Sequence, residues 1–581
     1  MPLQEWIHHW EEGAGARLLK VAGAILGFIV LGCLYDLLAF QGFSNEEAME
    51  TAQVARNLSE GKGYVTQSIR PLSIYLLQRQ AGPAAKLDIP LPAPDLNSPP
   101  VYPLLMAGLM EVLPFSFTAS QNWFYQPERW IAVFNQVLFF AAVLVLFRIA
   151  RRLFEARVAW LSTIIFAGTN LFWKFTVSGL STMLLLLIFL AVVWCLAGIE
   201  ERERAAPTSG GQAGLVVLAG ALMGIGGLTR YAFAWMILPV ALFIAAIARR
   251  ARVRLCLALL ASFLVVMGPW LVRNFMVSGA FFGGAGYALV EGTPPLEEDR
   301  LERSFDPGND LKRVSLLDVT DKFLTNARAM WRDDLPRFGG NWVSAFFLVG
   351  LLIPFHSPAL GRIRMFLVFS LIVLFVVQAL GQTHLSADSP EINSENLLVL
   401  LAPLVFVYGV GLFFILLDQL NLATVDARGA AVGGFIVVLS IPFVTSLLLG
   451  RAAAANSPYM PLHVQLAARL TKPQELMMSD IPGAVAWYGE RNCAWLTLDD
   501  DREFLKLNAL HPVKALFLTQ RTTDERFLSE MMLKRTSWGY FVMECEANGE
   551  VPTGFPLTKA RSDLLPYQMF LSDQARWRMP P

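Results

Sequence analysis

Charged residues are scarce in this sequence: they make up 16% of its 581 residues, whereas 55% of the residues are hydrophobic. Soluble domains carry about 25% charged residues, so this composition excludes an ordinary water-soluble protein. The shortage is concentrated in apolar runs close to the ~20 residues that a helix needs to cross a bilayer. The clear runs are residues 18–40, 130–150, 177–198, 253–275, 363–381, 396–417 and 429–450. Shorter or weaker runs are 156–173, 213–229, 232–248 and 341–356.

The runs predict a polytopic α-helical membrane protein with about eleven transmembrane helices. Arginines gather in alternate short loops, after the second, sixth and eighth runs. The positive-inside rule places these loops and the N-terminus in the cytoplasm. The loops 41–128 and 276–340 and the tail 451–581 then lie on the extracytoplasmic face. We therefore divide the chain into a transmembrane domain, 1–450, and a small extracytoplasmic domain, 451–581.

Other features are also missing. Lys plus Arg equal Asp plus Glu at 47 each, so the net charge gives no reason to expect a nucleic-acid partner, and we expect none. No phosphate-binding P-loop signature occurs, and residues 1–17 do not resemble a cleavable signal peptide. Of only five cysteines, Cys493 and Cys545 lie in the tail, where an oxidising compartment would permit a disulfide. Whether they are bonded stays open.

The tail alternates short apolar runs with helix-like stretches. The strand-like runs are 475–481, 493–498, 513–520 and 538–545, and the helix-like stretches are 482–490, 501–510 and 524–533. This alternation predicts a small α/β domain with a largely parallel sheet. Asp480 follows the first strand, at the edge where such sheets bind ligands. A turn or cap before Pro482 is the competing interpretation.

The first external loop opens with SNEEAMETAQVARNLSEGKGY, which predicts a short helix where the chain leaves the membrane. Three carboxylates lie on it: Glu46, Glu47 and Glu50. A structural interpretation is available, because Ser44 and Glu47 have the spacing of a capping box. Acidic residues in a first turn also complement the helix dipole.

Three further external segments have their own patterns. Residues 61–78 alternate enough to be extended, and the apolar stretch 101–113 predicts a helix at the membrane interface. Between the ninth and tenth runs lie His384, Asp388, Glu391 and Glu395. One histidine with scattered acids matches no specific metal-ligand spacing, so a solvated loop is the favoured interpretation there.

Several short motifs together resemble the GT-C superfamily of integral-membrane glycosyltransferases, which use lipid-phosphate sugars. They are the acidic pair on the juxtamembrane helix, then ARNLSEGKGY, NSPPVYPLL and RIARRLF after the second run. GLTRYAF and PWLVRNFMVSG add to the likeness, because this group often has an arginine in both places. The likeness covers the membrane part of the chain and is greatest to bacterial relatives of protein mannosyltransferases and aminoarabinose transferases. It implies a GT-C-like transmembrane fold.

In that family an Asp-Glu pair heads the first external loop, and the Asp is the catalytic base. Counting back from Arg56 without a gap places Glu47 on the Asp position, and one inserted residue moves the match to Glu46. Glu50 also stays open. This sequence has Glu where the family usually has Asp.

The sequence also departs from the family just before the paired prolines. Aminoarabinose-type enzymes have an acidic and a basic residue there, whereas this chain has Asn97 and Ser98. The metal and phosphate contacts that the family assigns there are therefore not carried over. Asp95, two residues earlier, is a candidate replacement for the acidic residue.

Transfer from a polyprenyl-phosphate sugar needs a base for the acceptor hydroxyl and cationic or metal stabilisation of the leaving phosphate. Arginine forks suit phosphate. The candidates are Arg230 and Arg273, at the external ends of two spans, and Arg70 in the first external loop. Each also fits an interfacial anchor whose charged end reaches water. No metal ligands are assigned, and a divalent metal stays open as a cofactor.

The resemblance implies an inverting glycosyltransferase of the cytoplasmic (inner) membrane. It would transfer a sugar from a polyprenyl-phosphate donor to a lipid, protein or glycan acceptor on the extracytoplasmic face. A transporter or flippase of a lipid-linked sugar is the alternative, although transporters tend to place charges at midspan and here the charges gather at span ends. A membrane-anchored scaffold that displays the tail is a third interpretation.

Overall fold

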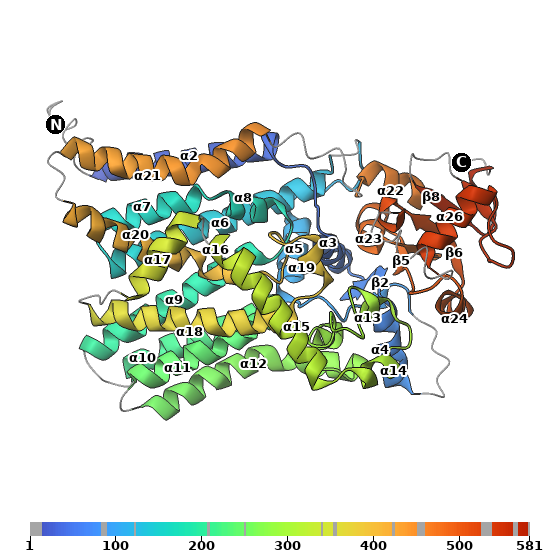
Figure 1. Cartoon of the computed structure of the whole chain (residues 1–581), viewed down its shortest axis with the longest axis horizontal. Helices are drawn as coiled ribbons and strands as arrows, with labels where there is room; N and C mark the ends of the chain where they lie inside the picture. Colours follow the sequence, from blue (N-terminus) through green and yellow to red (C-terminus); the bar gives the residue numbers. More distant parts are fainter. Residues whose placement is uncertain are drawn as a thin grey trace.

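The computed structural model shows a bundle of long helices with a mixed α/β domain at one end (Figure 1). It describes residues 14–82, 90–120, 124–205, 210–248, 251–337, 341–352, 357–420, 425–449, 459–523, 537–561 and 568–578. Within these ranges eight helices are long and apolar enough to cross a membrane. They are α2 (Ala14–Leu38), α6 (Gln126–Leu153), α9 (Thr182–Ala205), α10 (Gly210–Thr229), α12 (Arg252–Ser278), α18 (Pro358–Gly381), α20 (Ala402–Gln419) and α21 (Val425–Leu449).

The eight helices account for all seven clear apolar runs and one of the weaker ones. The three other weak runs form shorter apolar helices. These are α7 (Ala156–Ala167), the 3-10 turn η1 (Tyr231–Met236) with α11 (Ile237–Ile247), and α17 (Asn341–Leu352). The fold is thus a polytopic helical membrane protein, as the composition predicts.

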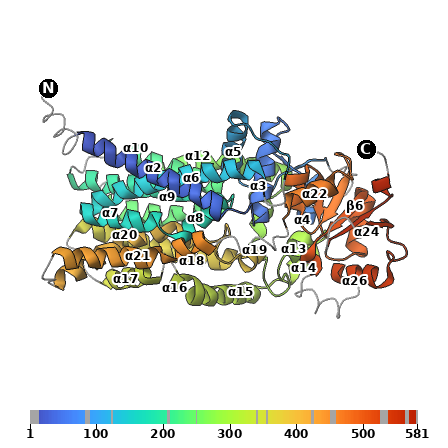
Figure 2. The same cartoon turned by 90° about the horizontal axis from the view of Figure 1, so that it is seen from above.

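Every long loop gathers at one end of the bundle. The start of α2 lies at the opposite end, far from the C-terminal domain, in both views (Figures 1 and 2). The first loop contributes α3 (Glu46–Ser59), α4 (Pro71–Ala81) and α5 (Val101–Val112). The later loops contribute α13 (Arg300–Arg303), α14 (Gly308–Arg313), α15 (Leu316–Ala329), α16 (Leu335–Arg337) and α19 (His384–Asp388), with α8 (Asn170–Val177) beside them.

The C-terminal domain is built on a six-stranded sheet with the order β2-β5-β4-β6-β8-β7. Strands β4 (Leu476–Ser479), β5 (Asn492–Trp495) and β6 (Val513–Leu518) are parallel, β8 (Met569–Ser572) is antiparallel to β6, and β7 (Lys559–Arg561) is antiparallel to β8. The helices are α22 (Pro461–Ala468), α23 (Pro482–Gly489), α24 (Arg502–Leu510) and α26 (Trp538–Asn548). The largely parallel α/β arrangement is the one predicted.

One edge strand of this sheet comes from the first external loop. β2 (Ser68–Ile69) pairs in parallel with β5, with Ile69 opposite Ala494. The buried core of the domain also takes in Ile69, Ile74 and Phe305 from the two external loops. The sheet therefore extends beyond residues 451–581, and the domain is joined to the membrane part by shared hydrogen bonds and a shared core.

Some local predictions were wrong. Residues 538–545 form a helix, because the buried Trp538, Phe541, Val542 and Cys545 repeat at helical spacing and the Ser537 side chain accepts a hydrogen bond from the Tyr540 amide. Residues 61–78 are extended only in β2 and the two-residue β1 (Val65–Thr66), which pairs with β3 (Ala93–Pro94).

Beyond β2, the chain turns into α4, with Pro71 in its first turn, where proline is favoured. The helix predicted at 524–533 lies outside the described residues. Cys493, buried in β5, and Cys545, in α26, are both unbonded.

Candidate active site

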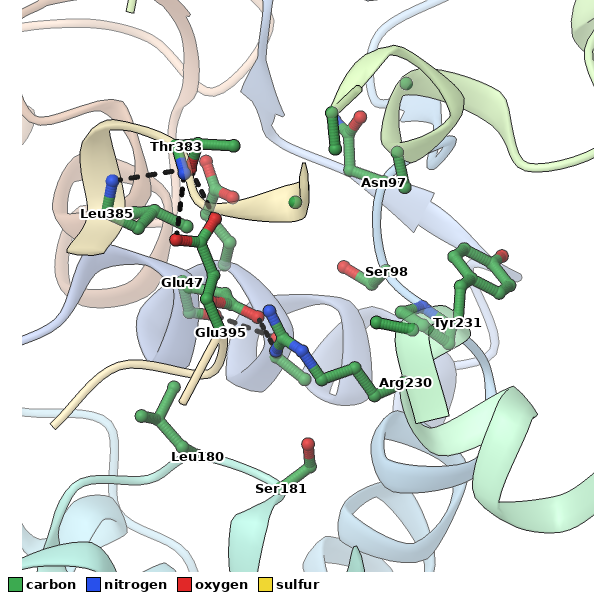
Figure 3. Close-up of a pocket in the computed structure, with 18 of the residues that line it drawn as sticks. Glu47, Asn97, Ser98, Leu180, Ser181, Arg230, Tyr231, Thr383, Leu385 and Glu395 are labelled. Atoms are coloured by element: carbon green, nitrogen blue, oxygen red, sulfur yellow. Dashed lines mark hydrogen bonds and ion pairs between the residues drawn. The ribbon is translucent and has the colours of Figure 1, made fainter. Parts of the chain in front are cut away.

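A cavity of about 200 Å³ lies where the helix bundle meets the external loops. It is lined by α3, by the segment after β3, by the turn after α10 and by the loops on either side of α19. Figure 3 shows Glu47 and Arg230 facing each other in it, with Asn97 and Ser98 on one side and Thr383 and Glu395 on another. Parts of the chain more than 300 residues apart thus form one site.

Glu47 lies in the first turn of α3 and points into this cavity. Its Oε1 is 3.1 Å from Nη1 of Arg230, and its Oε2 accepts a hydrogen bond from the Ser394 hydroxyl. The predicted capping box is wrong, because Asn45 is the N-cap residue and its Oδ1 accepts from the Glu47 amide at 2.9 Å. The carboxylate of Glu47 therefore serves the cavity and not the helix end.

Glu46 points away from the cavity, toward the C-terminal domain. Its Oε1 accepts from the Gly483 amide at 2.9 Å, and its Oε2 lies 3.0 Å from Nη1 of Arg521. Burial, opposed by the charge of Arg521, raises the pKa of Glu46 to about 7. Adjacent residues of one helix turn thus face different domains, because neighbouring positions on a helix project about 100° apart.

Glu50 lines the cavity one turn further along α3. Ser68 donates to its Oε1 at 2.8 Å, and Arg70 forms an ion pair with its Oε2. Arg70 also pairs with Glu302 and lines the cavity. Glu50 is therefore neutralised by a neighbouring cation and held by a hydroxyl.

The three predicted arginines separate in space. Arg230 and Arg70 line the cavity, whereas Arg273 is not among its lining residues. Arg273 donates from Nη1 to the Asp95 carbonyl oxygen at 2.7 Å, and its guanidinium carbon lies 4.9 Å from the ring centre of Trp270. It holds the backbone that carries Asn97 to the cavity.

Asp95 is buried and also lies outside the cavity lining. Its carboxylate accepts from the backbone amides of Asn97 at 3.2 Å and Ser98 at 3.0 Å. These bonds fix the turn that presents Asn97 and Ser98. Asp95 therefore shapes the site from behind.

A second group of titratable residues was not predicted. Glu291, Glu302 and His384 bring ligand atoms to within 4.8 Å of one another, and both glutamates line the cavity. His384 Nδ1 is 2.9 Å from Glu291 Oε1, and its Nε2 is 3.9 Å from Glu302 Oε2. Although burial alone lowers it, the hydrogen bond to Glu291 and the neighbouring carboxylates raise the pKa of His384 to about 9.

The solvated-loop interpretation was wrong for His384 and Glu395. Glu395 is buried, lines the cavity and accepts from the Thr383 amide at 3.0 Å.

Asp480 stabilises a turn, which was the competing interpretation of this residue. Its Oδ2 accepts from both the amide and the hydroxyl of Thr519 and of Thr522. No sequence motif brings Glu291 and Glu302 together with His384.

The comparisons with known proteins agree with this architecture. Residues 97–272 match the family model of dolichyl-phosphate-mannose-protein mannosyltransferase. No curated protein sequence matches the chain. The fold resembles ArnT from Cupriavidus metallidurans bound to undecaprenyl phosphate, at 12% identity and a TM-score of 0.54 over 98% of this chain and 99% of that one.

The fold also resembles the oligosaccharyltransferase of Archaeoglobus fulgidus. The form without ligands is 11% identical, with a TM-score of 0.53 over 87% of this chain and 70% of that one. The AglB complex with an inhibitory peptide and a dolichol-phosphate is 12% identical, with a TM-score of 0.52 over 97% and 75%.

The apolar helices and the shared fold define a multi-pass membrane protein. Residues 97–272 thus match this mannosyltransferase family model, and the chain as a whole has the fold of these integral-membrane glycosyltransferases.

Proposed function

We propose that this protein transfers a sugar from a polyprenyl-phosphate donor to a hydroxyl-bearing lipid, protein or glycan, with Glu47 as the catalytic base. The observation that carries the proposal is the Glu47 carboxylate in the cavity, 3.1 Å from the Arg230 guanidinium. A base and a phosphate-binding cation then lie side by side at the end of the membrane-spanning helices. ArnT with undecaprenyl phosphate and AglB with a dolichol-phosphate support a lipid-phosphate ligand.

The chemistry follows from the placement of these two groups. Glu47 takes the proton of the acceptor hydroxyl while the hydroxyl oxygen attacks the anomeric carbon, and the bond from that carbon to the phosphate oxygen breaks. Arg230 stabilises the negative charge left on the polyprenyl phosphate. The Ser394 hydroxyl fixes the orientation of Glu47. The remaining lone pairs of the Glu47 carboxylate can accept the proton of the acceptor hydroxyl.

A divalent metal fits the second group of carboxylates. Glu302 Oε2 is buried without a hydrogen-bond partner and faces His384 Nε2, while Glu291 bonds the other ring nitrogen, an arrangement typical of metal-ligating histidines. Glu302 and His384 would hold the ion, which would displace the proton from Nε2 of His384, and Glu291 would orient the ring. A bound ion would add positive charge for the leaving phosphate. A structure of the Archaeoglobus fulgidus enzyme contains Zn and sulfate, and a loss of transfer on chelation that added metal restores would support this part.

The proposed location is the cytoplasmic (inner) membrane, with the N-terminus in the cytoplasm and the cavity on the extracytoplasmic side. The arginine-rich short loops support this orientation. Residues 1–450 would form the catalytic membrane domain and residues 451–581 the bulk of the external one. Glu47 is preferred to Glu46 and Glu50 as the base, because Glu46 faces Gly483 and because the side chain of Glu47 is 27% exposed, whereas that of Glu50 is only 10% exposed.

The test is sugar transfer by the purified protein from a panel of radiolabelled polyprenyl-phosphate sugars, with native membranes as acceptor. Glu47→Gln should lower transfer by at least about 100-fold, the lower end expected for a general base. Glu60→Gln, at the other end of α3, is the matched control and should retain activity. Full activity of Glu47→Gln would refute the assignment of the base. Donor binding without transfer by the wild-type protein would favour a lipid-sugar transporter instead.

A further inference from the structure

One arginine of the C-terminal domain reaches the first turn of α3. Arg521 lies in the 3-10 turn η6 (Gln520–Thr523) that directly follows β6. Its Nη1 is 3.0 Å from Glu46 Oε2, and its Nη2 is 2.7 Å from Asp388 Oδ2. The same Nη1 donates to the Tyr459 hydroxyl at 3.1 Å.

The two carboxylates bound by Arg521 lie shortly before Glu47 and before Ser394, the residue that donates a hydrogen bond to Glu47. Glu46 is adjacent to Glu47 in α3. Asp388 begins the loop that reaches Ser394, whose hydroxyl donates to Glu47. Within this loop the Asn393 side chain donates to the Ser389 carbonyl oxygen at 2.5 Å and accepts from the Asn396 amide at 2.8 Å, so it links the two ends of the loop.

The turn that carries Arg521 is itself held by the sheet. Asp480, at the end of β4, accepts hydrogen bonds from Thr519 and Thr522 on both sides of Arg521. The amide of Gly483, at the start of α23, donates to Glu46. A Cβ built on Gly483 would lie 2.7 Å from Glu46 Cγ and 3.1 Å from the Glu46 carbonyl oxygen, which leaves no room for a side chain between α23 and α3.

We propose that Arg521 and Gly483 are positioning residues: through Glu46 and Asp388 they fix the first turn of α3 and the loop to Ser394, and so aim the Glu47 carboxylate. The inference rests on the proposed function of Glu47 and assigns a role in the reaction to the C-terminal domain. A rigid sheet is suited to this task, because misplacing a catalytic group by about 1 Å can lower a rate by about 100-fold.

The first test needs no substrate. Hydrogen–deuterium exchange of the full-length protein is compared between wild type and Arg521→Gln. We expect at least tenfold faster exchange in residues 46–50 and 388–397 of the variant. Arg576→Gln is the matched control, since Arg576 is paired with Glu475 and Asp573 within the same domain and does not contact α3. Unchanged exchange in both segments of Arg521→Gln would overturn the proposal.

The second test uses the donor that is active in the transfer panel. Arg521→Gln and Gly483→Ala should lower kcat by about 10- to 100-fold with little change in the KM for the donor, and Arg521→Lys, which can reach one carboxylate, should restore part of it. Glu46→Gln combined with Arg521→Gln should be little worse than Arg521→Gln alone. An unchanged kcat in Arg521→Gln, with transfer still abolished by Glu47→Gln, would refute the positioning role alone. Transfer retained in Glu47→Gln would refute the proposed base, and the exchange result would still decide whether Arg521 orders the two segments.

Discussion

Replacing Arg230 by glutamine is expected to weaken the binding of a polyprenyl phosphate strongly. The Arg230 side chain is 17% exposed, lines the cavity and lies beside Glu47. A hydrogen bond to a charged group in such a partly buried setting contributes about 1.5–3 kcal/mol. The loss of that energy corresponds to a rise in Kd of about 10- to 150-fold.

Arg273→Gln is the informative comparison, because both arginines fit the same motif-based prediction but only Arg230 lines the cavity. Arg273 donates to the backbone carbonyl oxygens of Asp95 and Tyr64. Its loss should therefore lower the melting temperature and leave the Kd within about threefold, well below the change expected from a lost charged hydrogen bond.

The assay is equilibrium binding of a fluorescent polyprenyl phosphate to each purified variant in detergent at fixed ionic strength, with folding checked by thermal melts. A Kd for Arg230→Gln within twofold of wild type would refute the placement of the phosphate beside Arg230. An equal loss of affinity in both variants would show that affinity depends on the shape of the loop and not on the guanidinium in the cavity.

Two further outcomes are expected. Glu128 accepts hydrogen bonds from the side chains of Trp487 and Tyr488 and from the Phe43 amide. Glu128→Gln should therefore lower the stability of the docked C-terminal domain by about 1–3 kcal/mol. Thermal unfolding measures this change, and an unchanged melting temperature would contradict it. Since burial raises the pKa of Glu46 to about 7, lowering the pH through 7 protonates Glu46 and removes its ion pair with Arg521. The kcat should then fall below pH 7 in the wild type, and a pH–rate profile of Glu46→Gln should lack that fall.

The membrane part of the fold could be read from the sequence, because a spanning helix satisfies its own backbone and needs only an apolar run of sufficient length. The parallel strands of the tail could also be predicted from local sequence, since each is a short apolar run between helix-like stretches. Residues 538–545 were misread because an apolar segment of that length fits either period until its buried positions are known. The pairing of β2 with β5 was not predicted, because two residues carry too little pattern and the paired positions lie more than 400 residues apart in the chain.

For the candidate site, too, some features could be predicted from the sequence and others only from the tertiary structure. The sequence by itself determined that carboxylates open a helix at the membrane surface and that arginines end two of the spans, since both follow from residue type and position along the chain. Only the tertiary structure decided that Glu47 faces the cavity while Glu46 faces Gly483, that Arg230 lines the site while Arg273 supports its wall, and that Glu291 and Glu302 meet His384. The physical reason is that the direction of a side chain, and its partners from distant segments, are fixed by long-range packing, which local sequence patterns do not encode.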